Sequence, residues 1–246
     1  MKIASFSDIH GNHPALIAVL EDIEKQGVDL SVCAGDLVGY GPYPNEVIDD
    51  LRKHRVPTIQ GNYDDGVGFD RDECGCAYRT SIEKETGYQS LEWTKREVTS
   101  RNKKYLQKLP NHILWDRGDS RTLLVHGSPR RINEYLYENR PVESIERMLN
   151  PLNVDTLIFG HTHLHYHRFI SGVNMVNDGS VGRPNDGDTR GCYALIDTGK
   201  KFSVEFRRVI YPVEEVAVTM IEKGLPVWLA DYLRNAGSPI NSFHEG

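Results

Sequence analysis

Residues 2–12, KIASFSDIHGN, join a short apolar run to two side chains that can bind a metal ion. Ile3, Ala4 and Phe6 predict a buried strand. Asp8 and His10 follow it two residues apart, and side chains with this spacing in extended backbone project to the same side. The pair alone is a weak signal, so its meaning depends on whether the pattern recurs along the chain.

Similar polar side chains follow two further predicted strands. A helix over residues 14–26 and a buried strand over 28–34 complete a β-α-β unit with the first strand. Asp36 comes just after the second strand, and Asn62 comes after a third strand predicted over 56–60. Sites in open α/β sheets lie just beyond the carboxyl ends of strands, so we expect these side chains to face one site.

The second half of the chain is rich in predicted strands and supplies three histidines. His126 follows one predicted strand directly, and His161 and His163 follow another after a single glycine. A turn is expected at 117–119. The strands of this half are predicted over residues 112–115, 121–125, 156–159, 173–177, 192–197 and 202–209. The order of elements indicates an α/β fold whose halves form the two sheets of one sandwich.

Length and composition favour a soluble globular protein. The 246 residues suffice for a single domain over 1–246, with a helical C-terminal tail at about 212–246. The net charge of −6 argues against binding a nucleic-acid polymer as the main function. No apolar stretch approaches the roughly 20 residues of a membrane span. Asp8 and His10 interrupt the first apolar run too early for a signal peptide, so a cytoplasmic location is expected.

The four cysteines are too few and too scattered for a disulfide framework. Cys74 and Cys76 flank one glycine and are compatible with zinc or redox chemistry. A zinc site needs four ligands at familiar spacings, and no second pair is nearby. A loop that carries two thiols is therefore the favoured interpretation.

The strand-end side chains together exceed what one ion needs. Mixed nitrogen and oxygen ligands of this kind suit Mn²⁺, Fe, Zn²⁺ or Ni²⁺ rather than Ca²⁺. Two ions with a shared carboxylate, about 3.5–4 Å apart, can hold a bridging hydroxide and position a phosphoryl group for in-line attack. A lone histidine on a strand is usually structural, but chance placement of a whole set behind apolar strands is implausible. The set comprises Asp8, His10, Asp36, Asn62, His126, His161 and His163.

The motifs D-x-H at 8–10, G-D at 35–36, G-N at 61–62, H-G at 126–127 and G-H-x-H at 160–163 occur in the order and approximate spacing of one known family. The chain resembles the calcineurin-like metallophosphoesterases over nearly its whole length. Further segments are similar to the small bacterial phosphodiesterase branch of that family. They are GDLVGYGP at 35–42, SLEWT at 90–94, HGSP at 126–129 and DGSVG at 178–182.

The resemblance implies a four-layer αββα sandwich of two mixed sheets flanked by helices. It also implies two metal ions, one held by Asp8, His10 and His163, the other by Asn62, His126 and His161, with Asp36 bridging them. Two phosphate contacts are expected, Asn12 just after the first motif and Arg130 just after HGSP.

One residue departs from the family pattern. Many members have histidine directly after G-N, where it protonates the leaving oxygen or stabilises the transition state, whereas this chain has Tyr63. A tyrosine with a pKa of about 10 is a poor acid near neutrality, though it can donate a hydrogen bond. We expect Tyr63 to contact substrate. Asp64 either hydrogen-bonds within its own turn or takes part in catalysis.

The leading hypothesis is a binuclear metal-dependent phosphoric ester hydrolase, more specifically a phosphodiesterase for a small phosphodiester or nucleotide. A metal-bridging hydroxide would attack phosphorus, with Asp36, Asn62 and Tyr63 as the catalytic set. One alternative is a phosphomonoesterase or protein phosphatase, which an open site with two or more phosphate-contacting arginines would favour. A second alternative is a non-catalytic interaction scaffold on the same fold, as in the retromer subunit that resembles this family.

Overall fold

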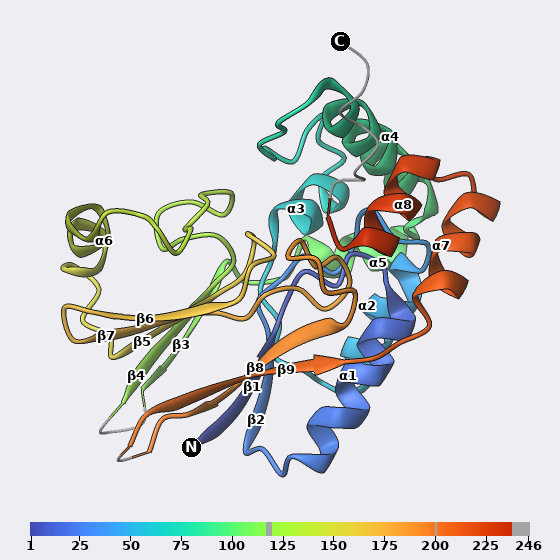
Figure 1. The fold of residues 1–246 in the computed structure, drawn as a ribbon. Coiled ribbons are helices and arrows are strands. Elements are labelled where there is room, and N and C mark those ends of the chain that lie inside the picture. The colour runs from blue at the N-terminus through green and yellow to red at the C-terminus, as the bar shows by residue number, and fades with distance from the viewer. Residues whose placement is uncertain (117–119, 200, 238–246) are drawn as a thin grey trace.

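The computed structural model describes residues 1–116, 120–199 and 201–237, so the turn expected at 117–119 and the last residues of the predicted tail lie outside it. Figure 1 shows the arrangement of the helices and strands. In chain order they are β1 (Lys2–Phe6), α1 (His13–Lys25), β2 (Leu30–Cys33), α2 (Pro44–Lys53), α3 (Asn62–Gly68), α4 (Ser81–Glu97), α5 (Ser100–Leu106), β3 (His112–Asp116), β4 (Arg121–Val125), α6 (Val142–Leu149), β5 (Thr156–Phe159), β6 (Tyr166–Ile170), β7 (Val173–Asn177), β8 (Gly191–Asp197), β9 (Ser203–Val209), α7 (Val213–Glu222) and α8 (Val227–Asn235).

The strands form two mixed sheets. One has the order β2-β1-β8-β9, with β1 parallel to β2 and antiparallel to β8. The other has the order β3-β4-β5-β7-β6, in which β4, β5 and β7 run parallel and the two edge strands are antiparallel to their neighbours. This confirms the predicted pair of sheets.

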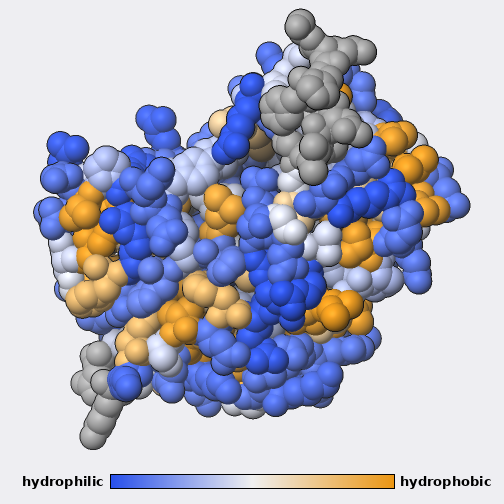
Figure 2. Space-filling model, in the orientation of Figure 1, coloured by the Kyte–Doolittle hydropathy of each residue, from blue (hydrophilic) through white to orange (hydrophobic). Residues whose placement is uncertain are grey.

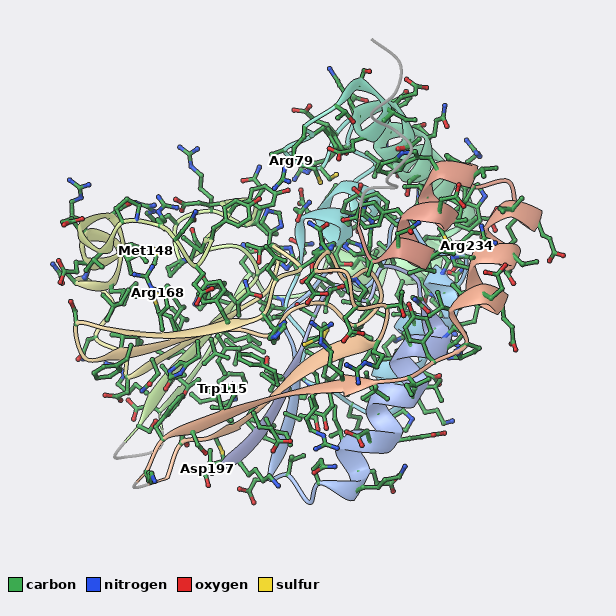
Figure 3. All side chains as sticks on the ribbon, viewed as in Figure 1. Arg79, Trp115, Met148, Arg168, Asp197 and Arg234 are labelled. Carbon is green, nitrogen blue, oxygen red and sulfur yellow. The ribbon has the colours of Figure 1, made fainter. Side chains whose placement is uncertain are left out.

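Alternation along the strands creates a core between the sheets. Ile3 of β1 and Val32 of β2 face Leu124 of β4 and Ile158 of β5 in one cluster of buried side chains. Trp115 of β3, labelled in Figure 3, packs against this cluster. Successive strand residues point to opposite faces of a sheet, so the residues that alternate with these point away from the other sheet. Another layer must cover them.

Helices cover the outer faces of both sheets. Phe6 of β1 belongs to a cluster of buried side chains with Leu16 of α1 and residues of α2, α7 and α8. Phe159 of β5 belongs to another cluster with Ile145 and Met148 of α6. In Figure 1, α1 and α7 lie beyond the first sheet and α6 beyond the second. The chain is therefore a four-layer αββα sandwich, as the family resemblance implied.

One predicted strand is wrong. The segment 56–60 forms only an isolated bridge between Cys33 and Thr58. Pro57 has no backbone N–H to donate to a ladder, so pairing cannot extend through this segment. Asn62 consequently begins α3 instead of following a strand, although the extended segment still brings it to the same edge.

Figure 2 shows a mostly hydrophilic face with separate apolar patches, among them patches over α6 and around α7. Within the described ranges, no helix combines the length and the apolar character needed to cross a membrane.

Candidate metal centre

The carboxyl ends of β1, β2, β4 and β5 meet at one edge of the sandwich, and two groups of candidate ligands lie there. In the first group, the Nε2 atoms of His10 and His163 are 3.1 Å apart, and Asp8 Oδ1 lies 3.3 Å from His163 Nε2. The outer Nδ1 atom of His10 donates to the Val38 carbonyl at 3.0 Å, and that of His163 to the Arg183 carbonyl at 2.7 Å.

The second group adjoins the first. His126 Nε2 lies 3.2 Å from His161 Nδ1, 3.0 Å from Asn62 Oδ1 and 3.4 Å from Asp36 Oδ2. The Nδ1 atom of His126 donates to the Ala34 carbonyl at 2.8 Å. These contacts bring together on one side the carboxylate, the amide and both imidazoles that the sequence placed at different strand ends.

Asp36 faces both groups. Its Oδ2 atom lies 3.4 Å from His126 Nε2 in one group and 3.7 Å from His10 Nε2 in the other. Its Oδ1 atom accepts the backbone N–H of Tyr63 at 2.8 Å, which fixes the orientation of the carboxylate. A carboxylate held between two sets of nitrogens is suited to contact two cations at once.

The hydrogen bonds to backbone carbonyls determine which ring nitrogens are free. A neutral imidazole that donates from Nδ1 keeps its lone pair on Nε2. In the first group two such lone pairs point at each other and cannot form a hydrogen bond. A metal ion between them would satisfy both, and outer-nitrogen hydrogen bonds of this kind are typical of metal-ligating histidines.

Two buried polar atoms also lack partners. Asp8 Oδ1 and His161 Nε2 make no hydrogen bond within the described part of the chain. Such atoms cost free energy unless something binds them. The donor set and the partnerless carboxylate oxygen therefore fit divalent transition metal ions.

Burial influences protonation at the site. It lowers the pKa of His10 to about 4 and that of His161 to about 3, which leaves both rings neutral near pH 7. Burial also opposes a charge on His126, but the Asp36 carboxylate outweighs it and raises the pKa to about 10. A cation that binds beside His126 would have to displace this proton.

Asp64 holds the Asp36 turn in place. Its carboxylate accepts the backbone N–H groups of Asp36, Leu37 and Gly61, each at 2.9 Å. Burial and the Asp36 charge raise the pKa of Asp64 to about 7. These contacts favour a hydrogen-bonding role for Asp64 over a catalytic one. They include the N–H groups of Asp36 and Leu37, which lie outside the turn of Asp64 itself.

Asp178 supports the first strand end in a similar way. Its carboxylate oxygens lie 2.6 Å from the hydroxyl oxygens of Ser5 and Ser7, and the Ser7 hydroxyl also lies within hydrogen-bond distance of Asp8. Although Asp178 begins the DGSVG segment, no role was predicted for it from the sequence. Its signal was a carboxylate and two alternating serines inside apolar runs.

The backbone of the site is strained. Five candidate ligands have positive φ angles, namely Asp8 (52°), His10 (50°), Asp36 (55°), His161 (68°) and His163 (59°). Non-glycine residues adopt this left-handed region only where the surrounding structure compels it, and such residues cluster at functional sites. Strain at five converging side chains supports a functional role for the cluster.

Close packing requires glycine beside the carboxylates. A Cβ atom on Gly160 would lie 2.1 Å from Ser7 Oγ and 2.5 Å from Asp8 Oδ2. On Gly61 it would lie 2.1 Å from Asp36 Oδ1. These contacts explain physically why glycine precedes the ligand in two of the motifs.

The cysteine pair contacts a candidate ligand. The thiols of Cys74 and Cys76 are 3.2 Å apart, and Asn62 Nδ2 donates to the Cys74 carbonyl at 3.0 Å and to Cys76 Sγ at 3.3 Å. These bonds turn Asn62 Oδ1 toward His126. Neither cysteine belongs to a three-residue metal-ligand group in the described residues, and the pair instead helps to orient Asn62.

The two expected phosphate contacts are engaged elsewhere. Asn12 caps α1 by accepting the N–H of Ala15 at 3.2 Å, and its amide donates to the Gly182 carbonyl at 2.9 Å. Arg130 forms an ion pair with Glu134 and does not line the pocket that contains the candidate ligands. The structure thus does not bring either side chain to that pocket.

Tyr63 is at the pocket, beneath other aromatic rings. Its ring centre lies 5.3 Å from that of His10 and 4.7 Å from that of Tyr40. Burial raises its pKa well above the ordinary value. Its hydroxyl faces Cys74 and Tyr78 but makes no well-formed hydrogen bond within the described residues.

The pocket over the two groups is aromatic and carries an arginine that the sequence analysis did not single out. Tyr135 stacks beside Tyr137 with ring centres 5.6 Å apart, and its ring centre lies 4.0 Å from that of His161. Arg183 lines the same pocket. Other lining residues include Tyr40, Tyr63, Tyr78, Arg79, Trp228 and Tyr232.

Comparison with known proteins reveals relatives over most of the chain. The family model for the calcineurin-like phosphoesterase superfamily domain matches residues 1–201. An uncharacterized protein of Methanocaldococcus jannaschii is 31% identical, with 94% of this chain and 96% of that protein covered. Phosphodiesterase YfcE of Escherichia coli is 26% identical, with 80% and 88% covered.

Two solved structures share the fold of this chain. A metallophosphoesterase from Sphaerobacter thermophilus superposes with a TM-score of 0.77 at 30% identity, and the match covers 96% of this chain and 100% of that one. A hypothetical protein from Pyrococcus horikoshii superposes with a TM-score of 0.83 at 24% identity, covering 96% and 99%.

Proposed function

We propose, from the premise that this chain belongs to the calcineurin-like phosphoesterase superfamily, that it is a binuclear metal-dependent phosphodiesterase acting on a small phosphodiester or nucleotide. The observation that carries the proposal is the pair of ligand groups with Asp36 between them. The name of the relative YfcE supports a diester substrate.

Each residue of the candidate set has a proposed place. Asp8, His10 and His163 would hold one ion, Asn62, His126 and His161 the other, and Asp36 both. The ions, as Mn²⁺, Fe, Zn²⁺ or Ni²⁺, would polarise the phosphoryl oxygens and lower the pKa of water.

The chain itself would keep this arrangement rigid. Asp64 and Asp178 fix the turns that carry Asp36 and Asp8 through buried hydrogen bonds, so the ligands need little reorganisation when substrate binds. Tyr63 lines the pocket, and its hydroxyl, which faces Cys74 and Tyr78 without a well-formed partner among the described residues, would turn to the substrate as a hydrogen-bond donor.

One observation favours a second candidate function, that of a phosphomonoesterase. Two arginines line the pocket, Arg183 in its wall and Arg79 on the segment before α4 (Figure 3). Guanidinium groups that contact the extra charge of a terminal phosphate would favour monoesters. The diester remains our first choice because the pocket is otherwise lined mainly by aromatic rings.

Hydrolysis assays test both candidates. We would chelate the protein, add Mn²⁺ and measure turnover of bis(p-nitrophenyl) phosphate and p-nitrophenyl phosphate. The Asp36→Asn variant should abolish turnover, while Asp65→Asn, which alters a carboxylate paired with surface Arg71, serves as the matched control. Faster diester turnover supports the proposal, and a monoester preference supports the second candidate. Absence of both turnover and bound metal would refute them and favour an interaction scaffold.

Three further expectations stay predictions. They are one domain over residues 1–246, a small phosphate-ester substrate instead of a nucleic-acid polymer, and a cytoplasmic location.

A further inference from the structure

We propose that Arg183 forms a subsite for a second, non-scissile phosphate, so that the preferred substrates carry two neighbouring phosphates. The position of the scissile phosphate, over the two ligand groups, rests on the proposed function. The subsite itself is argued from the surroundings of Arg183.

The Arg183 guanidinium lies between two tyrosine rings. Its central carbon is 4.1 Å from the ring centre of Tyr40 and 3.7 Å from that of Tyr232. Contacts of this kind stabilise the cation and hold the plane of the guanidinium in one orientation. The side chain is half-buried in the wall of the pocket.

Arg183 has no carboxylate partner within the described part of the chain. Some arginines of the protein do have one, since Arg207 pairs with Asp22 and Arg234 with Glu214. A cation removed from water normally gains a counter-charge, and the rings supply only a quadrupole. The remaining N–H donors of a fixed planar fork match the oxygens of a phosphate.

The position of Arg183 indicates a second phosphate rather than the scissile one. Its carbonyl accepts Nδ1 of His163, so its backbone lies on the side of that ring opposite to Asp8. Tyr40, which the guanidinium covers, meets the ring of His10 edge-on with centres 5.0 Å apart. The guanidinium thus packs on a ring that contacts His10, so a group bound to it would lie beside the metal centre.

Calorimetry with simple anions tests the subsite without requiring turnover. Phosphate and pyrophosphate are titrated into the Mn²⁺-loaded protein, its Arg183→Gln and Arg183→Lys variants and an Arg190→Gln control, which alters an arginine paired with Asp188. Metal chelation by pyrophosphate affects all proteins alike, so it cancels when each variant is compared with wild type. Thermal unfolding verifies that each variant is folded.

Wild type should bind pyrophosphate at least about tenfold more tightly than phosphate, because the fork adds charge-assisted hydrogen bonds. Arg183→Gln should lose this preference with little change in phosphate affinity, Arg183→Lys should retain part of it, and the control should retain all of it. Equal weakening of both anions would overturn the proposal and place Arg183 at the scissile phosphate. Unchanged binding of both would make Arg183 a purely structural cation.

Failure of the proposed function would look different. A protein that prefers pyrophosphate through Arg183 but hydrolyses neither aryl ester nor pyrophosphate itself would keep the subsite and refute the hydrolase. Turnover of the diester without an Arg183-dependent preference for pyrophosphate would support the hydrolase and refute the subsite.

Discussion

The sharpest prediction concerns Asp64, which touches no proposed metal position but holds the Asp36 turn. In the native protein, Asp64 Oδ2 accepts the N–H groups of Asp36 and Gly61, and Oδ1 accepts that of Leu37. In Asp64→Asn, the amide oxygen can still accept the first two, but the amide nitrogen must then face the Leu37 N–H. An orphaned buried donor costs about 1–3 kcal/mol, and the two retained bonds lose about 1 kcal/mol each with the charge.

Part of this loss is recovered. Burial and the Asp36 charge raise the pKa of Asp64 to about 7, so a neutral side chain avoids some desolvation. We expect a net destabilisation of about 2 kcal/mol or more at pH 8, where the carboxylate is ionised. Metal content should also fall, because the Asp36 turn is released.

Urea unfolding of the chelated protein, together with metal analysis of the loaded protein, measures both effects. The matched control is Asp65→Asn, whose carboxylate pairs, among the described residues, only with surface Arg71 and should contribute no more than about 1 kcal/mol. If Asp64→Asn unfolds like the control and binds a full complement of metal, the role assigned to Asp64 is wrong.

Three other predictions address packing, the pocket hydroxyl and metal. Gly160→Ala places a Cβ 2.5 Å from Asp8 Oδ2 and should reduce the amount of bound metal that elemental analysis measures. The control Gly172→Ala, whose Cβ would have no atom within 4 Å, should bind as much metal as wild type. A full metal content in Gly160→Ala would contradict the importance of this close contact. Tyr63→Phe should change the unfolding free energy by less than about 1 kcal/mol, because the hydroxyl has no well-formed partner among the described residues. It should lower kcat/KM for the diester about three- to tenfold, which is the effect of losing one neutral hydrogen bond. A roughly hundredfold fall would instead indicate that Tyr63 acts as a general acid. Chelation should lower the unfolding free energy by about 2.7 kcal/mol relative to protein with metal at 100 times Kd, and an unchanged Tm would argue against any site.

Local signals predicted most of the fold and the candidate ligands. Apolar runs that end in Asp8, Asp36, His126 and His161 mark strand ends, and the carboxyl ends of those strands meet at one edge. The segment 56–60 misled because its apolar residues resemble a strand although Pro57 prevents a ladder.

Side-chain partners at long sequence separation could not be predicted. Arg130 follows a ligand motif, but it forms an ion pair with Glu134, four residues further along the chain. Arg183 follows a glycine-rich segment, and in the pocket it packs against Tyr232, which α8 brings from a distant part of the chain. Proximity to a motif was therefore a poor guide to which arginine faces the site.

The number of metal ions bound per chain tests the central claim most directly. Elemental analysis of chelated protein reloaded with Mn²⁺ should give two ions for wild type and fewer for Asp36→Asn, because both ligand groups face that carboxylate. A wild-type protein that binds one ion or none, or an Asp36→Asn variant that still binds two, would contradict the binuclear centre.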